Sequence, residues 1–581
     1  MEKGKNSGMD GKLVRPQPRN KIARFFRDLK GRLSLWRYNS GFSRFGLKGK
    51  HPLRLIASPD NPWMGSMKKG ADYVDGQFTH AGFQVDVDAQ DLWVESEVGP
   101  EAFYGWSQSF CWLADLDMMA DKPRARARAE GLMRQWLNYY GEWNARSWRQ
   151  DLIGDRILYW ILHAPLILAS DDQVYRSKVL NSLARQARHL DRSVMRGPDG
   201  LPRIRALIGL ILSGMLLPFN DNRYDRGMKL LLNALGRLVM ADGGFKSRSV
   251  IDVMAAAKLL ITLKSIIVLQ NRDLPAWLQQ VLDRMVPYLK AQCHGDGGFA
   301  QFQGAFEADA EGLEKVYLMA EAKGKPIDNA SLSGFQRMQA NKSLVIVDVG
   351  PPPPFNLSDK GTLAPLAMEF SDGRDRLVVN TGGNRPGWST GPAQQHALCR
   401  TAPYHSTIFM DEKSPGQIDS QNRIKGGGET TWFERQANEH GLWLSAAFEG
   451  HVDGQKIRQE RRLFLSAGGE DLRGEDSLSQ IMEGTFARFK KAQPRAIAVR
   501  FHLHPKVTAS LTREGKAIIL RSPSGRGWLF RAKGGEIQLA EGRYYNKEMK
   551  TQRSNLIILV AAEGSTEAKF NWSFKRLDTR D

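Results

Sequence analysis

Charged and acid–base side chains gather around three short turns in the first half of the chain. They are Arg203, Arg205, Asp242, Arg248, His294 and Asp296. An arginine can hold a carboxylate or a sulfate through two parallel hydrogen bonds, and a histidine can take up a proton near neutral pH. If the three turns share one mouth of the fold, these side chains can bind an anion and carry out acid–base chemistry on it.

The turns themselves repeat. Asp-Gly-Gly-Phe occurs at residues 242–245 and again at 296–299, and a weaker relative, Pro-Asp-Gly-Leu, stands at 198–201. Each motif closes one apolar helical run, where a glycine can supply the positive φ of a sharp turn and the aspartate can accept backbone N–H bonds. Repetition at hairpin spacing predicts a ring of helical hairpins whose turns gather at one end. A structural role is the alternative for each of these residues, because turn aspartates often cap backbone N–H groups.

Two domains of different class are expected. Apolar residues recur at helical spacing from Trp106 to about Leu318. After Pro326 the sequence changes to the alternating pattern that is typical of strands. Strands are predicted at residues 344–349, 366–370, 377–380, 406–410, 442–448, 461–465, 496–503, 517–520, 528–531, 556–560 and 570–574. The predicted fold is α then β: a basic tail and lead-in over 1–75, an incomplete (α/α) toroid over 76–328, and an antiparallel β-sandwich over 329–581.

The composition of the chain favours an anionic binding partner. The 581 residues carry 83 basic and 63 acidic side chains, a formal charge of +20, which suits an acidic polysaccharide, a nucleic acid or an anionic membrane surface. Cys111, Cys293 and Cys399 lie far apart without a CxxC motif, so neither a disulfide framework nor a thiolate zinc site is indicated.

The first fifty residues are strongly basic and contain no apolar stretch long enough for a secretion signal. Residues 22–36 mix aromatic and leucine side chains with Arg and Lys, so they can form a basic amphipathic helix on a membrane surface. A solvated basic tail is the alternative. No run reaches the roughly 20 apolar residues of a membrane span.

The order of the motifs along the chain resembles the heparinase II/III-like polysaccharide lyases. In the helical half the resemblance lies in residues 110–113, 148–151, Arg156, 159–161, 242–244, 247–249 and 294–297. In the sandwich it lies in residues 366–370, 377–382, Arg400, 404–407, 474–476 and 500–505. It covers nearly the whole chain after about residue 75 and implies the same toroid and sandwich.

Members of that family cleave uronate-containing glycans by β-elimination, which needs a group that neutralises the uronate carboxylate, a base, and an acid for the leaving oxygen. The resemblance implies His405 or His294 as the base and Tyr404 as the nearest candidate acid. Substrate contacts are expected from Arg203, Arg205, Asp242, Arg248, Asp296 and Arg400.

The chain departs from the family pattern at three places. Counting from Asp242 places Asp252, or a neighbour of it, where the family has its tyrosine. The segment 201–205 reads Leu-Pro-Arg-Ile-Arg where an Asn-His pair is usual, and residues 361–365 lack the histidine that precedes the strand. Several of the family's usual catalytic residues are therefore missing from this chain.

The resemblance leads us to expect a carbon–oxygen lyase acting on a glycosaminoglycan-like, uronate-bearing polysaccharide. The alternative is a noncatalytic acidic-glycan-binding or exopolysaccharide accessory protein. No cofactor is required, a structural zinc or calcium is left open, and the family implies the cell envelope or periplasm, with the cytoplasm as the alternative because no signal peptide is seen.

Other classes fit less well. Asp-Gly-Gly-Phe turns also occur in isoprenoid cyclases and prenyltransferases, but their acidic clusters or zinc ligands are not found, and no nucleic-acid-binding signature is present. His502 and His504, on one strand face with Arg500, have a spacing compatible with a metal, although packing is the alternative. Arg156, one helical turn from Trp160, is expected to stack or to support the core.

Overall fold

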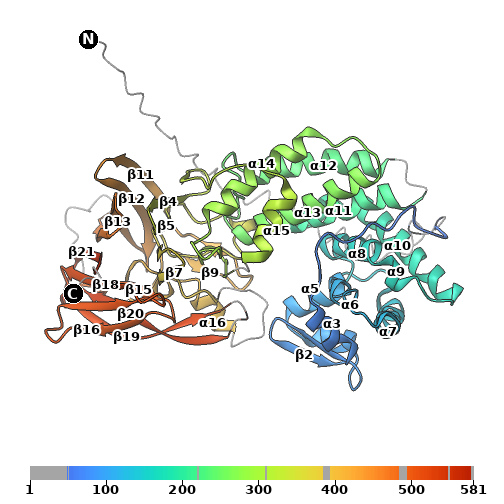
Figure 1. Cartoon of the computed structure of the whole chain (residues 1–581), viewed down its shortest axis with the longest axis horizontal. Helices are drawn as coiled ribbons and strands as arrows, with labels where there is room; N and C mark the ends of the chain where they lie inside the picture. The colour runs from blue at the N-terminus through green and yellow to red at the C-terminus, as the bar shows by residue number, and fades with distance from the viewer. Residues whose placement is uncertain are drawn as a thin grey trace, which may run out of the picture.

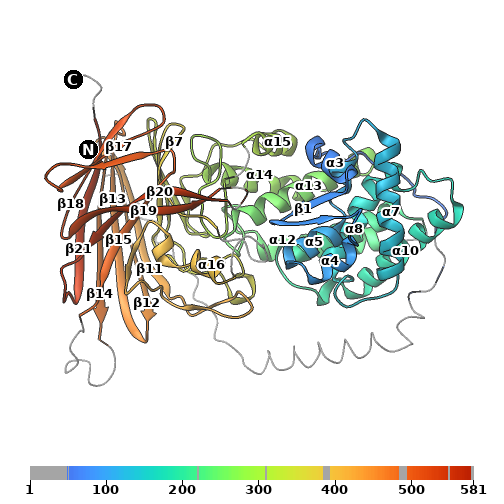
Figure 2. The same cartoon turned by 90° about the horizontal axis from the view of Figure 1, so that it is seen from below.

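The computed structural model has a helical domain at one end and two large β-sheets at the other (Figures 1 and 2). It describes residues 47, 49, 52–218, 222–307, 310–383, 393–482, 494–546, 548 and 550–577. The basic segment 22–36 lies outside the described residues. No helix in the described part of the chain is long and apolar enough to cross a membrane.

Helices dominate up to Ala320. They are α3 (Met67–Val74), α4 (Leu92–Val98), α5 (Glu101–Ser109), α6 (Leu113–Leu116), α7 (Lys122–Tyr140), α8 (Gln150–Leu162), α9 (Ala164–Ile167), α10 (Gln173–Ser193), α11 (Leu201–Leu216), α12 (Arg223–Leu238), α13 (Val250–Leu269), α14 (Ala276–Ala291) and α15 (Ala310–Ala320). A hairpin of β1 (Gln77–His80) and β2 (Phe83–Asp86) sits near their start. Helix α3 falls within the segment expected as a lead-in, and its Tyr73 packs into the helical core.

The repeated turns have the predicted geometry. Gly243 and Gly297 have φ of 86° and 85°. In each turn the aspartate accepts the N–H of the residue two positions on, at 3.1 Å for Asp242 and 2.9 Å for Asp296. Two matching backbone bridges, Val239 to Phe245 and Cys293 to Phe299, close the turns. The two copies are thus the same local structure, as the sequence repeat predicts.

From residue 329 onward the chain forms two antiparallel sheets. The nine-stranded sheet contains β3 (Asn329–Ala330), β4 (Phe335–Ala340), β5 (Ser343–Asp348), β6 (Met368–Asp372), β7 (Asp375–Val379), β8 (Ile408–Met410), β15 (Ile497–Leu503), β19 (Glu536–Tyr545) and β20 (Thr551–Val560). The eight-stranded sheet has the order β11 (Glu429–Asn438), β12 (Gly441–Val452), β13 (Gln455–Ser466), β14 (Asp471–Ile481), β21 (Glu567–Arg576), β18 (Gly527–Lys533), β17 (Ala517–Arg521) and β16 (Thr508–Leu511).

Short elements complete the second half. They are the β9 (Gln417–Ile418) and β10 (Ile424–Lys425) pair, helix α16 (Ala393–Leu398), and the 3-10 turns η1 (Val194–Arg196), η2 (Phe355–Leu357) and η3 (Ala402–Tyr404). The two large sheets bury an apolar core between them, as in a β-sandwich.

The nine-stranded sheet also joins the helical domain. Its residues Phe335, Leu344 and Ile346 belong to the same apolar cluster as the helices. One face of this sheet therefore packs against the eight-stranded sheet and the other against the helices, so the domain boundary is a packed seam.

Helices α8 and α11 cross at a pair of glycines. A Cβ added to Gly209 would lie 2.5 Å from the Gly154 Cα, and a Cβ added to Gly154 would lie 2.3 Å from the Arg205 carbonyl oxygen. The backbones can approach this closely only because neither residue has a side chain.

We expect Gly209→Ala to lower the free energy of unfolding by about 2 kcal/mol, because the new methyl group must push the helices apart. The control is Gly131→Ala on the exposed face of α7, where an added Cβ meets nothing within 4 Å. This change should raise stability by about 1 kcal/mol through helix propensity. Urea unfolding followed by circular dichroism measures both, and equal effects would contradict the close crossing.

Candidate functional site

The two Asp-Gly-Gly-Phe turns dock onto the β-sandwich. The carboxylate of Asp242 accepts the Ser333 N–H at 2.7 Å and the Ser333 hydroxyl at 3.0 Å. Asp296 accepts two hydrogen bonds from the Arg376 guanidinium, at 2.8 and 3.0 Å. Both aspartates therefore tie the helical domain to the nine-stranded sheet.

His294 is enclosed at the same seam. Its Nδ1 lies 2.9 Å from the Ser371 hydroxyl and its Nε2 lies 2.9 Å from a Glu369 carboxylate oxygen, and the imidazole is fully buried. Burial lowers the pKa of His294, although the Glu369 hydrogen bond opposes that shift. Both ring nitrogens are engaged by sandwich side chains, so neither is presented to a bound substrate.

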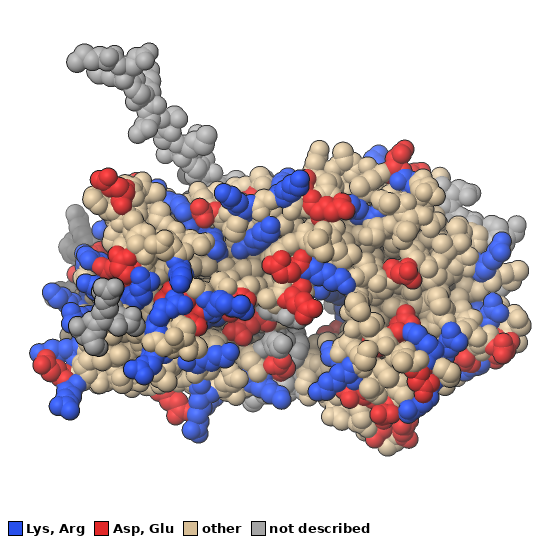
Figure 3. Space-filling view, viewed as in Figure 1, with Lys and Arg blue, Asp and Glu red and all other residues tan. Residues whose placement is uncertain are grey.

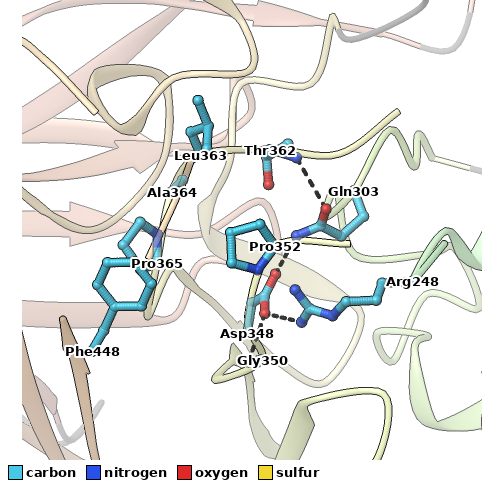
Figure 4. Close-up of a pocket in the computed structure, with 11 residues that line it drawn as sticks. Arg248, Gln303, Asp348, Gly350, Pro352, Thr362, Leu363, Ala364, Pro365 and Phe448 are labelled. Atoms are coloured by element: carbon cyan, nitrogen blue, oxygen red, sulfur yellow. Dashed lines mark hydrogen bonds and ion pairs between the residues drawn. The ribbon is translucent and has the colours of Figure 1, made fainter. Parts of the chain in front are cut away.

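Arg248 closes a small cavity between the domains (Figure 4). It donates to the carbonyls of Ser333 (2.7 Å) and Pro351 (2.8 Å) and pairs with Asp348, which also accepts Gln303 Nε2 at 2.7 Å. The cavity beside these groups measures about 10 Å³. That is room for one water molecule and not for a sugar ring.

Two further arginines expected to bind substrate instead hold loop carbonyls. Arg203 donates to Val194 (2.9 Å) and Gly197 (2.5 Å). Arg400 donates to Gly361 (2.7 Å), Asn422 (3.0 Å) and Ser358 (2.6 Å), and burial lowers its pKa to about 10. The guanidinium is well suited to this task because its donors form a rigid planar fork.

His405 and Tyr404 lie on the sandwich side of the seam. The Nδ1 of His405 lies 2.9 Å from the Thr401 carbonyl oxygen, the side chain is 3% exposed, and burial lowers its pKa. Tyr404 is half-buried against Cys399 and Tyr545, and burial raises its pKa. The two residues are adjacent in sequence, but their side chains contact different partners.

Arg205 differs from the other candidates, since its side chain is 37% exposed. It pairs with Asp155 at 3.2 Å, and the Asp155 carboxylate raises the Arg205 pKa. Burial raises the pKa of Asp155 to about 6, with Arg205 opposing the rise. This pair offers an anion-binding cation and a carboxyl group that can hold a proton near neutral pH. The surface between the two lobes is hollowed, with acidic and basic side chains at its rim (Figure 3).

An ion pair spans the two domains close to Arg205. Lys360 of the sandwich bonds to Asp252 of α13, and Asp252 also accepts the Ser247 hydroxyl at 3.0 Å. The Asp252 carboxylate and Arg205 both influence the Lys360 pKa, so the three groups lie within electrostatic range. Arg400 fixes the Lys360 loop by binding the carbonyls on both sides of it.

Sequence reasoning missed Lys360, Asp155, Glu369 and Arg376. Lys360 lies in a loop with no motif around it, so nothing in the sequence indicated its partner. Asp252 was noted only as the residue near the family's tyrosine position.

The histidine pair of β15 is also engaged. His502 Nε2 lies 3.0 Å from the Pro403 carbonyl oxygen and His504 Nε2 lies 3.3 Å from Glu307. Within the described ranges there is no group of three His, Cys, Asp or Glu residues that could hold a metal ion. Arg156 is buried, stacks on Trp136, and donates to Gln108, Gln186 and Ser147.

Residues 322–573 match the family model described as heparinase II/III-like, C-terminal. The C-terminal domain is heparinase II/III-like. The heparinase III crystal structure matches with a TM-score of 0.71 at 13% identity, over 96% of this chain and 91% of that one. A heparan sulfate lyase HepC mutant of Pedobacter heparinus matches with a TM-score of 0.59 at 13% identity, over 88% and 83%. The expected fold is thereby confirmed, and at these identities the likeness concerns the fold.

A full-length relative carries a different name. FtsZ-localized protein C of Caulobacter vibrioides (strain NA1000 / CB15N) is 28% identical over 556 residues, which cover 93% of each chain. The similarity therefore extends across both the helical domain and the sandwich of this chain.

Glu307 makes the stability of the seam between the domains depend on pH. Burial opposes its ionisation, but the hydrogen bond with His504 and the charge of Arg376 outweigh burial and lower its pKa from 4.5 to about 2. A carboxyl group with a lowered folded-state pKa stabilises the fold above its unfolded pKa, and this contribution is lost as the pH falls.

We therefore expect Glu307→Gln to lower the free energy of unfolding at pH 7 by about 2 kcal/mol. The difference from the unaltered protein should shrink as pH falls from about 4.5 toward 2, where Glu307 itself becomes protonated. Urea unfolding at a series of pH values measures it, and a difference that stays constant from pH 7 to pH 3 would contradict this role of the carboxylate.

The Lys360–Asp252 bridge can be tested by a double-mutant cycle. Lys360→Met should lower the free energy of unfolding by about 2 kcal/mol, because it leaves the buried Asp252 carboxylate without its cation. Adding Asp252→Asn should recover part of that loss. The control is Lys425→Met, since Lys425 pairs with Asp419 at the exposed surface and should contribute less than about 1 kcal/mol. Equal losses for the two lysines would refute the bridge.

Proposed function

We propose that this protein is a noncatalytic member of the heparinase II/III-like fold that acts with FtsZ at the site of cell division. The observation that carries the proposal is the Lys360–Asp252 ion pair. It joins the domains at Asp252, which, counted from Asp242, falls at or beside the position where the family has its tyrosine.

The neighbouring groups support the same conclusion. The imidazole of His294 is held by Ser371 and Glu369, and Arg248 is held by backbone carbonyls and Asp348. A β-elimination needs a base and an acid that reach the substrate. Among the described residues, the only predicted anion-binding side chain with substantial exposure is Arg205, and it already pairs with Asp155 at 3.2 Å.

The named relative supports the choice of process. Its similarity extends across both domains, over 93% of each chain, and its name records localisation to FtsZ. A cytoplasmic location, one of the two considered from the sequence, is part of the proposal. It is supported by Cys111, Cys293 and Cys399, which are all free thiols and suit a reducing compartment.

The test compares activity with localisation. Purified protein incubated with heparan, hyaluronan, alginate and polyglucuronate should give no rise in the ultraviolet absorbance of unsaturated uronate, with an active heparan lyase as positive control. A fluorescent fusion should form a band that coincides with FtsZ and disperse when FtsZ is depleted, because localisation would depend on FtsZ.

Two outcomes would overturn the proposal. One is an absorbance rise that disappears in His405→Ala, which would establish the lyase expected from the resemblance. The other is a fusion whose position does not change after FtsZ depletion.

A further inference from the structure

The outer face of the eight-stranded sheet is the end of the molecule farthest from the helical domain (Figures 1 and 2). Successive side chains of a strand point to opposite faces, so one half of each strand's residues lines this outer face. On β21 the inward residues Phe570, Trp572 and Phe574 are buried, while Lys569 and Lys575 are exposed. The outer face is thus open to solvent.

Four exposed cations gather on three adjacent strands of this face. They are Arg521 on β17, Arg531 and Lys533 on β18, and Lys575 on β21, and we call them the basic face. The register places Arg531 opposite Ser573, Lys533 opposite Asn571, and Lys575 opposite Leu529. Strands lie about 4.8 Å apart and outward residues of one strand about 7 Å apart, so Arg531, Lys533 and Lys575 are near neighbours. Arg521 stands opposite Gly527, further along the same face.

Among the residues that the structure describes, these cations lack acidic partners. None of the four forms an ion pair with a carboxylate in the described part of the chain. The nearest acid in register, Asp471, is bound by Arg473 at 2.6 Å. Because neighbouring like charges lie within about one Debye length at physiological salt, they act together on a binding partner.

On the other half of the same face, the positive side chains have acidic partners. Arg458 pairs with Glu460 at 2.7 Å, Arg462 with Glu475 at 3.5 Å, and Lys569 with Glu475 at 2.9 Å. Charge is balanced there by one pair along β13 and two pairs between adjacent strands. The excess positive charge is therefore confined to β17, β18 and the end of β21.

Aliphatic side chains lie among the four cations. Ile519 of β17 stands opposite Leu529 of β18, which stands opposite Lys575 of β21, and Ile519 is 42% exposed. Nucleic-acid bases are held preferentially by aromatic platforms, and the outward aromatic pair of this sheet, Trp443 and Phe464, lies on β12 and β13 rather than among the four cations. Membrane-surface binding depends on a larger apolar face inserted below the headgroups. A flat surface that mixes cations with two aliphatic side chains fits an acidic polypeptide that carries apolar residues.

We infer that the basic face binds an acidic polypeptide segment of the division-site partner. This inference rests on the proposed function for its choice of a protein partner. The basic face is distant from the seam between the domains, where the predicted catalytic residues lie. Its electrostatic part predicts a strong salt dependence.

The test uses the double charge reversal R531E/K533E in the full-length protein. The matched control is R126E/K229E, which changes two exposed residues of the helical domain by the same total charge. Two polypeptide probes are used: fluorescent poly-L-glutamate, followed by anisotropy, and FtsZ polymers, followed by co-sedimentation. Binding of phosphatidylglycerol vesicles and of heparan is measured in parallel as the alternative. We expect R531E/K533E to weaken binding of both by about tenfold or more at 0.1 M salt, with the control unchanged. Circular dichroism and urea unfolding verify that both variants fold.

Each outcome separates the inference from the proposed function. If FtsZ pelleting is the same for R531E/K533E and the control, the basic face is not the docking surface, while the proposed function stands. If poly-L-glutamate binding depends on the face but the unaltered protein never pellets with FtsZ, the proposed function fails and the surface chemistry survives. If R531E/K533E weakens binding only to phosphatidylglycerol vesicles or to heparan, the inference of a protein partner is overturned.

Discussion

The Glu369 carboxylate is the interaction on which the domain arrangement depends. It is fully buried and accepts hydrogen bonds from the Gln301 N–H (2.9 Å), the Asn380 N–H (3.0 Å) and the Asn380 amide (3.1 Å), and it contacts His294 Nε2 (2.9 Å). A charge removed from water costs several kcal/mol unless such partners replace the lost hydration. His294 and Gln301 come from the helical domain and Asn380 from the sandwich. The carboxylate is therefore satisfied only when the two domains are docked.

This requirement constrains every neighbour at the seam. His294 must stay close to Glu369, Asp296 must stay close to Arg376, and Arg248 must satisfy the carbonyls of Ser333 and Pro351. Side chains of the types that could serve as base and substrate clamp are thus fixed between two domains. The cavity left beside Arg248, about 10 Å³, is a consequence of that packing.

The sequence predicted the order of domains and the turns well, because both depend on local signals. Glycine after aspartate fixes the turn, and the apolar period distinguishes helices from strands. The sequence did not predict strands β4, β11, β14 and β19, because they lack a clear alternation of apolar and polar residues. Many of their residues are polar, and one end of β11 is exposed. The candidate site was harder to predict. An arginine's role depends on whether a loop carbonyl lies within reach, and the loops that meet Arg203 and Arg400 are irregular.

The contacts that join the domains do not depend on whether the protein is catalytic. Glu369, Arg376 and Arg248 each satisfy buried polar groups of the opposite domain whether or not a substrate is turned over. Asp252 stands at or beside the position where the family has its tyrosine, and its partner is Lys360. That pair adds a further connection across the seam. If the protein admits no polymer, as we propose, this closed seam does not obstruct its function, and its outer surfaces remain open to partners.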